Sequence, residues 1–349
     1  MARLTNNRPA GGLRRGRGSR WAIFFLALGG LSLALGGQAQ GQSQAVKPLD
    51  PPLKLRLGLL PIADTILLHV AQGQGYFEKR GLLVELTPFQ SALEKDSAVM
   101  AGQLDGHFCE ISSAMVQRAQ GRPYKIVATT SHTEPNERVF GIVAKPNSKA
   151  KSLADVKGQS LGVARQTIVD FLADAFLARA GLPQDYFERR DVRKIPLRLQ
   201  TLIAGRLDLS VFPEPLLSMA EKAGGAVLVD DRDLDMPLAA VALKDEFATP
   251  AAVEALRAAL AEAVAYANAN PGPIRELMLS KGLISKSLAE GWTPPTYNPA
   301  HIPDRLPDKA LFEAYVDWLA RNDVLRRADS PGPLRPAPEF ADSIYQAGR

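Results

Sequence analysis

Short apolar runs alternate along the chain with stretches in which apolar residues recur at helical spacing. Residues 53–61, LKLRLGLLP, alternate and then become wholly apolar, which predicts a strand entering a buried sheet. A helix is expected over residues 63–81, because Gly81 stands where a helix C-cap belongs. The alternation continues with strands expected at 82–89 and 104–109 and helices at 91–103 and 112–121. This order is typical of a mostly parallel sheet with helices on both faces.

A second round of the same order begins at Ser160. Its longest helix is expected over residues 167–181, where apolar residues form one stripe at positions i, i+3, i+4, i+7 and i+8. The other elements are expected as strands at 160–164, 192–197 and 207–212 and as helices at 199–206 and 215–224.

The two rounds align at an offset of 100 to 104 residues. A helix end, a glycine cap and a strand start could produce any single match in an α/β protein. Several matches in one order at one offset instead predict two similar lobes with a cleft between them. The equivalent positions are Leu57-Gly58 and Leu161-Gly162, Gly81-Leu82 and Gly181-Leu182, Ala101-Gly102 and Ala204-Gly205, Leu104-Asp105 and Leu207-Asp208, and Glu110 and Glu214.

Three further strand-like runs connect the rounds. Residues 124–131 and 138–146 are expected to carry the chain into the second lobe, and residues 237–247 to bring it back. We therefore expect a discontinuous lobe I of residues 53–140 and 237–325, and a lobe II of residues 141–236. Beyond them, Thr249 caps a helix that Pro271 ends, and helices near 271–281 and 308–322 are expected to pack on lobe I. Residues 326–349 are Pro-rich and read as a surface tail.

Residues 1–45 differ in kind, because six arginines precede the apolar run WAIFFLALGGLSLAL and a small, polar stretch follows it. This order predicts a secretory signal peptide, although a retained anchor is the alternative. Its removal would take six of the 42 basic residues and leave 36 against 37 acidic ones, a net charge of −1 in place of +5. The basic balance is therefore no sign of a nucleic-acid partner. Cys109 is the only cysteine, so no internal disulfide can form.

Several segments together carry a family resemblance: the entry LGLLPIADTILLHVAQGQGYFEKRGLLVELTPF, then MAGQLDGHFCEISSA and FPEPLLSMA. With the signal sequence, they resemble the solute-binding proteins of ABC transporters, in the branch of thiamine-precursor, alkanesulfonate, taurine and nitrate binders. The resemblance covers roughly residues 53–325. It implies a periplasmic-binding type II fold in a free periplasmic monomer that closes on a small molecule and presents it to a membrane ABC permease.

Ligands of open α/β sheets bind beyond the carboxyl ends of the strands, so the loops there supply the candidate ligand residues. Asp64, Ser112, Ser113 and Thr167 could instead be helix caps, and His132 could be an ordinary surface residue. Glu110 and Glu214 occupy the same place in the two rounds, one per lobe. The candidates are Pro61, Asp64, Phe89, Gln90, Ser91, Glu110, Ser112, Ser113, His132, Arg165, Gln166, Thr167, Phe212 and Glu214.

The candidate set leaves the ligand's charge open. Asp64, Glu110 and Glu214 favour a donor-rich nitrogen heterocycle, such as a thiamine-pyrimidine precursor stacked on Phe89 or Phe212. Arg165 and the helix N-termini favour a small organic anion, such as a sulfonate, taurine, nitrate or a carboxylate. Three carboxylates against one arginine lean toward the heterocycle.

Motifs for catalysis are absent from the sequence: it holds no HExxH, CxxC, P-loop or GxSxG element. His69, His107, His132 and His301 lack metal-ligand spacing, so neither a metal nor a cofactor is expected. A binding protein is the favoured function. An exported enzyme on the same scaffold is the competing one, with Glu110 or His132 as its general base.

Overall fold

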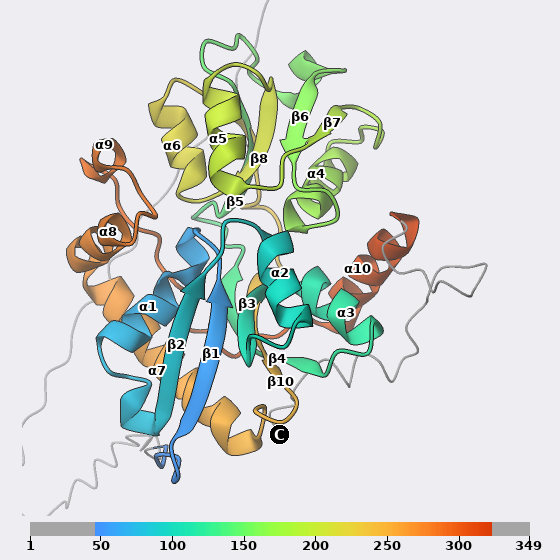
Figure 1. The fold of residues 1–349 in the computed structure, drawn as a ribbon. Helices are drawn as coiled ribbons and strands as arrows, with labels where there is room; N and C mark the ends of the chain where they lie inside the picture. The colour runs from blue at the N-terminus through green and yellow to red at the C-terminus, as the bar shows by residue number, and fades with distance from the viewer. Residues whose placement is uncertain (1–45, 323–349) are drawn as a thin grey trace, which may run out of the picture. The chain divides into compact units, whose positions relative to one another are not determined.

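The computed structural model describes residues 46–322, so the predicted signal peptide and the tail lie outside the described residues. Two five-stranded sheets organise this part of the chain (Figure 1). No helix within residues 46–322 is both long and apolar enough to cross a membrane.

The first sheet has the strand order β2-β1-β3-β10-β4. β1 runs parallel to β2 and β3, whereas β10 runs antiparallel to β3 and β4. Its strands are β1 (Leu53–Leu59), β2 (Leu82–Pro88), β3 (Gly106–Glu110), β4 (Tyr124–His132) and β10 (Pro237–Lys244). The helical segments between them are η1 (Ala63–Thr65), α1 (Ile66–Gly73), η2 (Glu78–Arg80), α2 (Ala92–Met100) and α3 (Ile111–Ala119).

The second sheet repeats this topology with the order β7-β6-β8-β5-β9. β6 runs parallel to β7 and β8, and β5 runs antiparallel to β8 and β9. Its strands are β5 (Phe140–Ala144), β6 (Ser160–Val163), β7 (Glu188–Asp191), β8 (Leu209–Pro213) and β9 (Ala226–Asp230). The helices here are η3 (Leu153–Val156), α4 (Ile168–Arg179), α5 (Ile195–Ile203) and α6 (Leu216–Lys222).

The repeat read from the sequence has a structural counterpart in both sheets. A Cβ on Gly58 would lie 2.6 Å from Leu104 Cδ1, and one on Gly162 would lie 2.5 Å from Leu207 Cδ1. The repeated aspartates also act alike, because Asp105 accepts from the Arg56 N–H at 2.9 Å and Asp208 from the Ser160 N–H at 3.1 Å. In each round the leucine of the Leu-Asp pair packs against the glycine of the neighbouring parallel strand and the aspartate bonds to a backbone N–H of that strand, β1 or β6.

The expected two-sheet architecture is confirmed, and each sheet is mixed because its crossover strands run antiparallel to their neighbours. Two expected elements differ in the structure. The helix expected over residues 63–81 is divided into η1, α1 and η2, and α1 ends at Gly73 whereas Gly81 caps η2. Residues 192–197 are not a strand, since α5 begins at Ile195 and the strand is β7, four residues earlier. β7 reads ERRD and lies at the edge of its sheet. An edge strand keeps a solvated side and needs no apolar run, so the hydrophobic pattern missed it.

The remaining helices follow β10. Thr249 caps α7 as expected, its Oγ1 accepting from the Ala252 N–H at 3.2 Å. Residues 308–322 are expected to pack on lobe I. In the structure they contact α4, where the rings of Tyr315 and Trp318 pack against the ring of Phe171. These helices are α7 (Pro250–Ala269), α8 (Pro271–Ser280), α9 (Lys286–Ala289) and α10 (Lys309–Arg321).

Candidate ligand site between the two sheets

A small central cavity lies where strand ends of the two sheets meet. Asp64 and Glu110 line it from the loops after β1 and β3, and Thr167, Ile168 and Arg198 line it from α4 and α5. Its volume is about 30 Å³, which is room for one or two water molecules. We call it the central cavity. A molecule larger than that enters only if the walls separate.

Three hydrogen bonds join loops of the first sheet to loops of the second beside this cavity. The Ile168 N–H donates to Glu110 Oε2 at 2.9 Å. The Ala63 N–H donates to the Glu214 carbonyl at 3.1 Å, and the Ile195 N–H donates to the Gln90 carbonyl at 3.2 Å. The two glutamates at equivalent places in the repeat therefore each bond to the opposite sheet's helix start, one through its carboxylate and one through its backbone.

Glu110 is a buried carboxyl group whose titration is displaced. Burial raises its pKa to about 7, against a smaller lowering by the Ile168 N–H and by the charge of Arg198. The N-terminus of α4 supplies that N–H, which is the usual partner of an anionic oxygen at a helix start. Near neutral pH this group therefore exchanges between a charged acceptor and a neutral donor.

Arg198 is the one arginine of α5 and lies wholly inside, with 1% of its surface exposed. Its Nη1 donates to the Val192 carbonyl at 2.9 Å, whereas its buried Nε has no hydrogen-bond partner within the described chain. The guanidinium carbon lies 5.2 Å from the centre of the Phe212 ring, a cation–π contact that holds the group in place. Burial lowers the pKa of Arg198 to about 10, so the side chain stays cationic.

Asp64 separates the central cavity from a second one. We call this second space, about 20 Å³ and lined also by His132, Glu134 and Tyr297, the side cavity. Asp64 is 4% exposed and its Oδ2 has no hydrogen-bond partner within residues 46–322. Burial raises the pKa of Asp64 to about 7, and a hydrogen bond with Ser131 opposes that shift.

Replacing Asp64 with asparagine is expected to change how stability varies with pH. The pKa of this carboxyl group is about 7 in the folded chain and about 3.9 in the unfolded chain. The native state therefore keeps the proton up to a higher pH than the unfolded state does. Stability from this group is therefore full below about pH 4 and falls as pH rises toward 7, by about 1.4 kcal/mol per pH unit. Asp64→Asn removes that fall. Urea unfolding of both proteins from pH 4 to 7 measures it, and parallel curves would contradict the assignment.

Five of the residues predicted from the sequence line the two cavities. Asp64 lines both, Glu110 and Thr167 line the central cavity, and His132 and Glu214 line the side cavity. The rest line neither of these cavities: Pro61, Phe89, Gln90, Ser91, Ser112, Ser113, Arg165, Gln166 and Phe212.

None of the four residues with a capping alternative caps a helix through its side chain, whereas Ser91, predicted only as a ligand residue, does. Ser91 is a helix cap, because its Oγ accepts from the Glu94 N–H at 3.2 Å. Asp64, Ser112 and Ser113 do not cap, since Asp64 lies within η1 and both serines lie within α3. Thr167 precedes α4 but turns its hydroxyl to the Ala164 carbonyl at 2.9 Å.

Two candidates serve as supports beside the cavity. Phe212 is fully buried beneath Arg198, and Gln90 supplies the carbonyl that joins the two sheets. Arg165 stays at the rim with 40% of its side chain exposed, 3.7 Å from Asp170. Glu214 already has a cationic partner, because Arg138 Nε donates to its Oε1 at 2.8 Å.

Arg198 is the residue that sequence reasoning missed. It falls in the one-residue gap between the predicted strand at 192–197 and the predicted helix at 199–206, so the wrong strand assignment hid it. The signal was there, because Ile195, Leu199 and Leu202 form the buried stripe of α5 and Arg198 stands within that stripe. A charged side chain is almost never fully buried unless a partner group compensates its charge, so an arginine within a buried stripe is a signal of a site.

The sequence from residue 50 to residue 279 matches the model of the NMT1-like family. The chain belongs to the NMT1-like family. A relative from Brucella abortus (strain 2308), provisionally named a binding protein, is 29% identical over an alignment of 226 residues, and the match covers 60% of this chain and 66% of that protein. The chain thus spans about two thirds of that relative's length.

Solved structures of binding proteins share the fold of this NMT1-like chain and confirm the expected periplasmic-binding architecture. The alkanesulfonate-binding protein from Xanthomonas axonopodis pv. citri, bound to MOPS, has a TM-score of 0.64 at 16% identity, covering 79% of this chain and 95% of its own. The aliphatic sulphonate binding protein of Escherichia coli has a TM-score of 0.64 at 20% identity, covering 82% and 95%. The nitrate-binding protein from Synechocystis PCC 6803 has a TM-score of 0.59 at 18% identity, covering 85% and 92%.

Proposed function

We propose that this chain is a periplasmic solute-binding protein that captures a small organic anion between its two sheets and delivers it to an ABC permease. Residues 53–140 with 237–325, and residues 141–236, act in this proposal as lobes that separate to admit the solute. The signal peptide of residues 1–45 supplies export. The likeness in fold to binding proteins for sulfonates and nitrate supports the proposal.

The observation that carries the choice of an anion is Arg198. A cation buried in a largely apolar cavity, with an N–H that no group within residues 46–322 accepts, is costly unless another acceptor meets it. Carboxylate, sulfonate and nitrate oxygens are the acceptors that fit a guanidinium best, since its donors form a planar fork. A solute oxygen at Arg198 would satisfy the buried Nε.

The carboxyl groups favour the same conclusion. The sequence leaned toward a nitrogen heterocycle because it offered three carboxylates against one arginine. Glu214 pairs with Arg138, and burial raises the pKa of Asp64 and Glu110 to about 7. Near neutrality these two groups are in part neutral donors, so they offset the charge of Arg198 less than two fully ionised carboxylates would. Glu110 in its neutral form could donate to a second oxygen of the anion.

Binding can be tested with a panel of solutes on the purified chain. We expect sulfonates, taurine, nitrate or short carboxylates to raise the melting temperature in proportion to the logarithm of their concentration, and mass spectrometry to recover the solute unchanged. An aminopyrimidine serves as the comparison. Stabilisation by the aminopyrimidine alone would favour the heterocycle, and conversion of any solute to a product would reject the binding function.

A further inference from the structure

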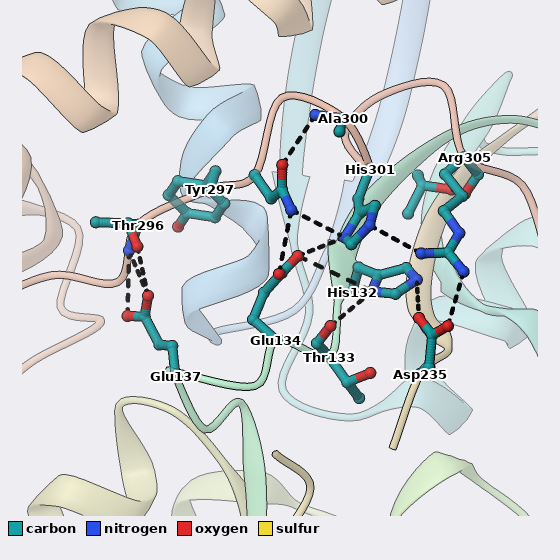
Figure 2. Close-up of polar contacts among 12 residues, drawn as sticks. His132, Thr133, Glu134, Glu137, Asp235, Thr296, Tyr297, Ala300, His301 and Arg305 are labelled. Atoms are coloured by element: carbon teal, nitrogen blue, oxygen red, sulfur yellow. Dashed lines mark hydrogen bonds and ion pairs between the residues drawn. The ribbon is translucent and has the colours of Figure 1, made fainter. Parts of the chain in front are cut away.

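Two of the four histidines lie together beside the side cavity (Figure 2). His132 ends β4, Glu134 follows it in the crossover to β5, and His301 comes from the segment between α9 and α10. Glu134 and His301 are 167 residues apart in the sequence, yet they are in contact. The rings of His132 and His301 lie 4.1 Å apart between centroids. Glu134 faces one edge of the pair, and Asp235 and Arg305 face the other (Figure 2). We call His132, Glu134 and His301 the histidine cluster.

The distances within the histidine cluster suit a metal ion. His301 Nδ1 lies 2.5 Å from Glu134 Oε1, and His132 Nδ1 lies 4.0 Å from the same oxygen. One ligand atom from each residue lies within 4.8 Å of the other two. A tetrahedral ion with bonds of about 2.0–2.1 Å holds its ligand atoms about 3.3 Å apart. The two distances to Glu134 Oε1 lie on either side of that value, so the side chains would have to shift to complete the arrangement.

A second, independent observation comes from burial. His132 is 2% exposed, and its Nε2 has no hydrogen-bond partner within the described chain, so this nitrogen is free to carry the ring proton when Nδ1 binds an ion. His132 and Glu134 also line the side cavity, whose volume of about 20 Å³ is enough for one water molecule. A buried imidazole next to a carboxylate, with space for a water, is the environment of a three-ligand metal site with one open position.

We propose that His132, Glu134 and His301 bind one divalent transition-metal ion of the Zn²⁺ class through the two Nδ1 atoms and a Glu134 carboxylate oxygen. Two imidazoles and one carboxylate are a ligand set that such ions accept, whereas Ca²⁺ and Mg²⁺ prefer oxygen ligands throughout. A water held in the side cavity supplies the fourth ligand. Spacing in the sequence does not reveal this set of residues, because it reports only ligands that are neighbours in the chain.

Binding through Nδ1 requires each ring to move its proton to Nε2. At present His132 Nδ1 donates to the Thr133 carbonyl at 2.7 Å, and His301 Nε2 accepts from Arg305 Nη1 at 2.8 Å. After the exchange His132 Nδ1 no longer donates to the Thr133 carbonyl, which must move aside for the ion, and Arg305 releases His301 and keeps its ion pair with Asp235, at 3.0 Å. The Nε2 proton of His132 then faces Asp235 Oδ1, now 3.7 Å away. A carboxylate behind a ligating histidine is the usual support of a metal site.

The site joins segments that are distant in the sequence. His132 and Glu134 belong to the crossover between β4 and β5, and Asp235 to the crossover between β9 and β10. An ion here would tie both crossovers to the segment around His301, apart from the central cavity. Metal binding is thus independent of the proposed solute, and a protein that fails to bind any anion can still bind the ion.

The test uses the chain without a histidine tag and Zn²⁺ alone as the probe. Calorimetry should give one ion per chain, and the melting temperature should rise with the logarithm of the Zn²⁺ concentration. His301→Ala and Glu134→Gln should abolish both effects at a concentration that saturates the parent, and Asp235→Asn should weaken binding by about 10- to 100-fold. His69→Ala and Glu137→Gln are the matched controls and should bind as the parent does.

Two outcomes would overturn the proposal: a parent chain that binds no Zn²⁺, or His301→Ala and Glu134→Gln variants that bind it with unchanged affinity. Circular dichroism checks that the variants are folded. If one is not, Co²⁺ substitution in the parent decides, because four-coordinate Co²⁺ absorbs visible light far more strongly than six-coordinate Co²⁺. A weak, six-coordinate spectrum would then reject the proposed site.

Discussion

Replacing Arg198 with methionine is expected to weaken the affinity for the anionic solute by about 100-fold or more, since losing one partner of a desolvated charge pair costs several kcal/mol of binding free energy. Methionine has a similar length and no charge, so it fills the space over Phe212 without a buried cation. The free energy of unfolding should change far less than the affinity, because a buried ion is costly to keep and an apolar replacement is often tolerated. Calorimetric titration measures the affinity and urea unfolding the stability.

Arg165→Met is the matched control for Arg198→Met. Arg165 belongs to the same sheet's loops but stays at the rim, with 40% of its side chain exposed, so its loss should lower affinity only a few-fold. Arg198→Lys separates charge from geometry: lysine keeps the positive charge but lacks the planar fork, and an intermediate affinity is expected. Equal losses for Arg165→Met and Arg198→Met would show that a general positive field, and not Arg198, selects the anion.

Replacing Trp318 with alanine is expected to lower the free energy of unfolding by about 3–5 kcal/mol, the usual cost of deleting a buried aromatic ring. Trp318 is 1% exposed, its Nε1 donates to Asp174 Oδ2 at 2.8 Å, and its ring meets Phe171 edge-on at 5.5 Å. Deletion leaves both a cavity and a buried carboxylate oxygen that has lost its donor. Urea unfolding with a common m-value measures the loss.

Trp292→Ala serves as the comparison for Trp318→Ala. Trp292 also donates its Nε1 to a side chain, Ser218 at 3.1 Å, but it is only partly buried. Its loss should therefore cost clearly less, about 1–2 kcal/mol by the area it buries. A cost for Trp318→Ala no larger than for Trp292→Ala would mean that α10 contributes little to the stability of the fold.

Arg198 and Trp318 both contact elements that are distant from them in the sequence. Arg198 is held by Phe212 and by the Val192 carbonyl and lines a cavity that Glu110 closes from the other sheet. Trp318 joins α10 to α4 across 144 residues. The first is expected to affect binding with little effect on stability, and the second to affect stability first, so the two variants separate the roles of these contacts.

The repeated two-sheet plan follows from the amino-acid sequence alone. Apolar runs and helical stripes report on neighbours within an element, and the offset between the rounds correctly matched Leu57-Gly58 of β1 with Leu161-Gly162 of β6. Asp64, Glu110 and Thr167 were predicted as ligand residues because they follow strand ends, and they line the central cavity. Their part in binding stays a prediction.

The buried Arg198 and the pairing of distant groups became visible only in the folded chain. β7 carries no apolar pattern because it lies at a sheet edge, so the sequence did not predict it. The strand was therefore expected too late in the chain, and the start of α5 and the place of Arg198 in its buried stripe were not predicted. The sequence does not show that Glu214 forms an ion pair with Arg138. It also does not show that His132 and His301 are neighbours, because only the fold brings them together. The physical reason is common to all three: periodicity records which face of an element is buried, whereas the partner of a buried charge is set by contacts between elements far apart in the sequence.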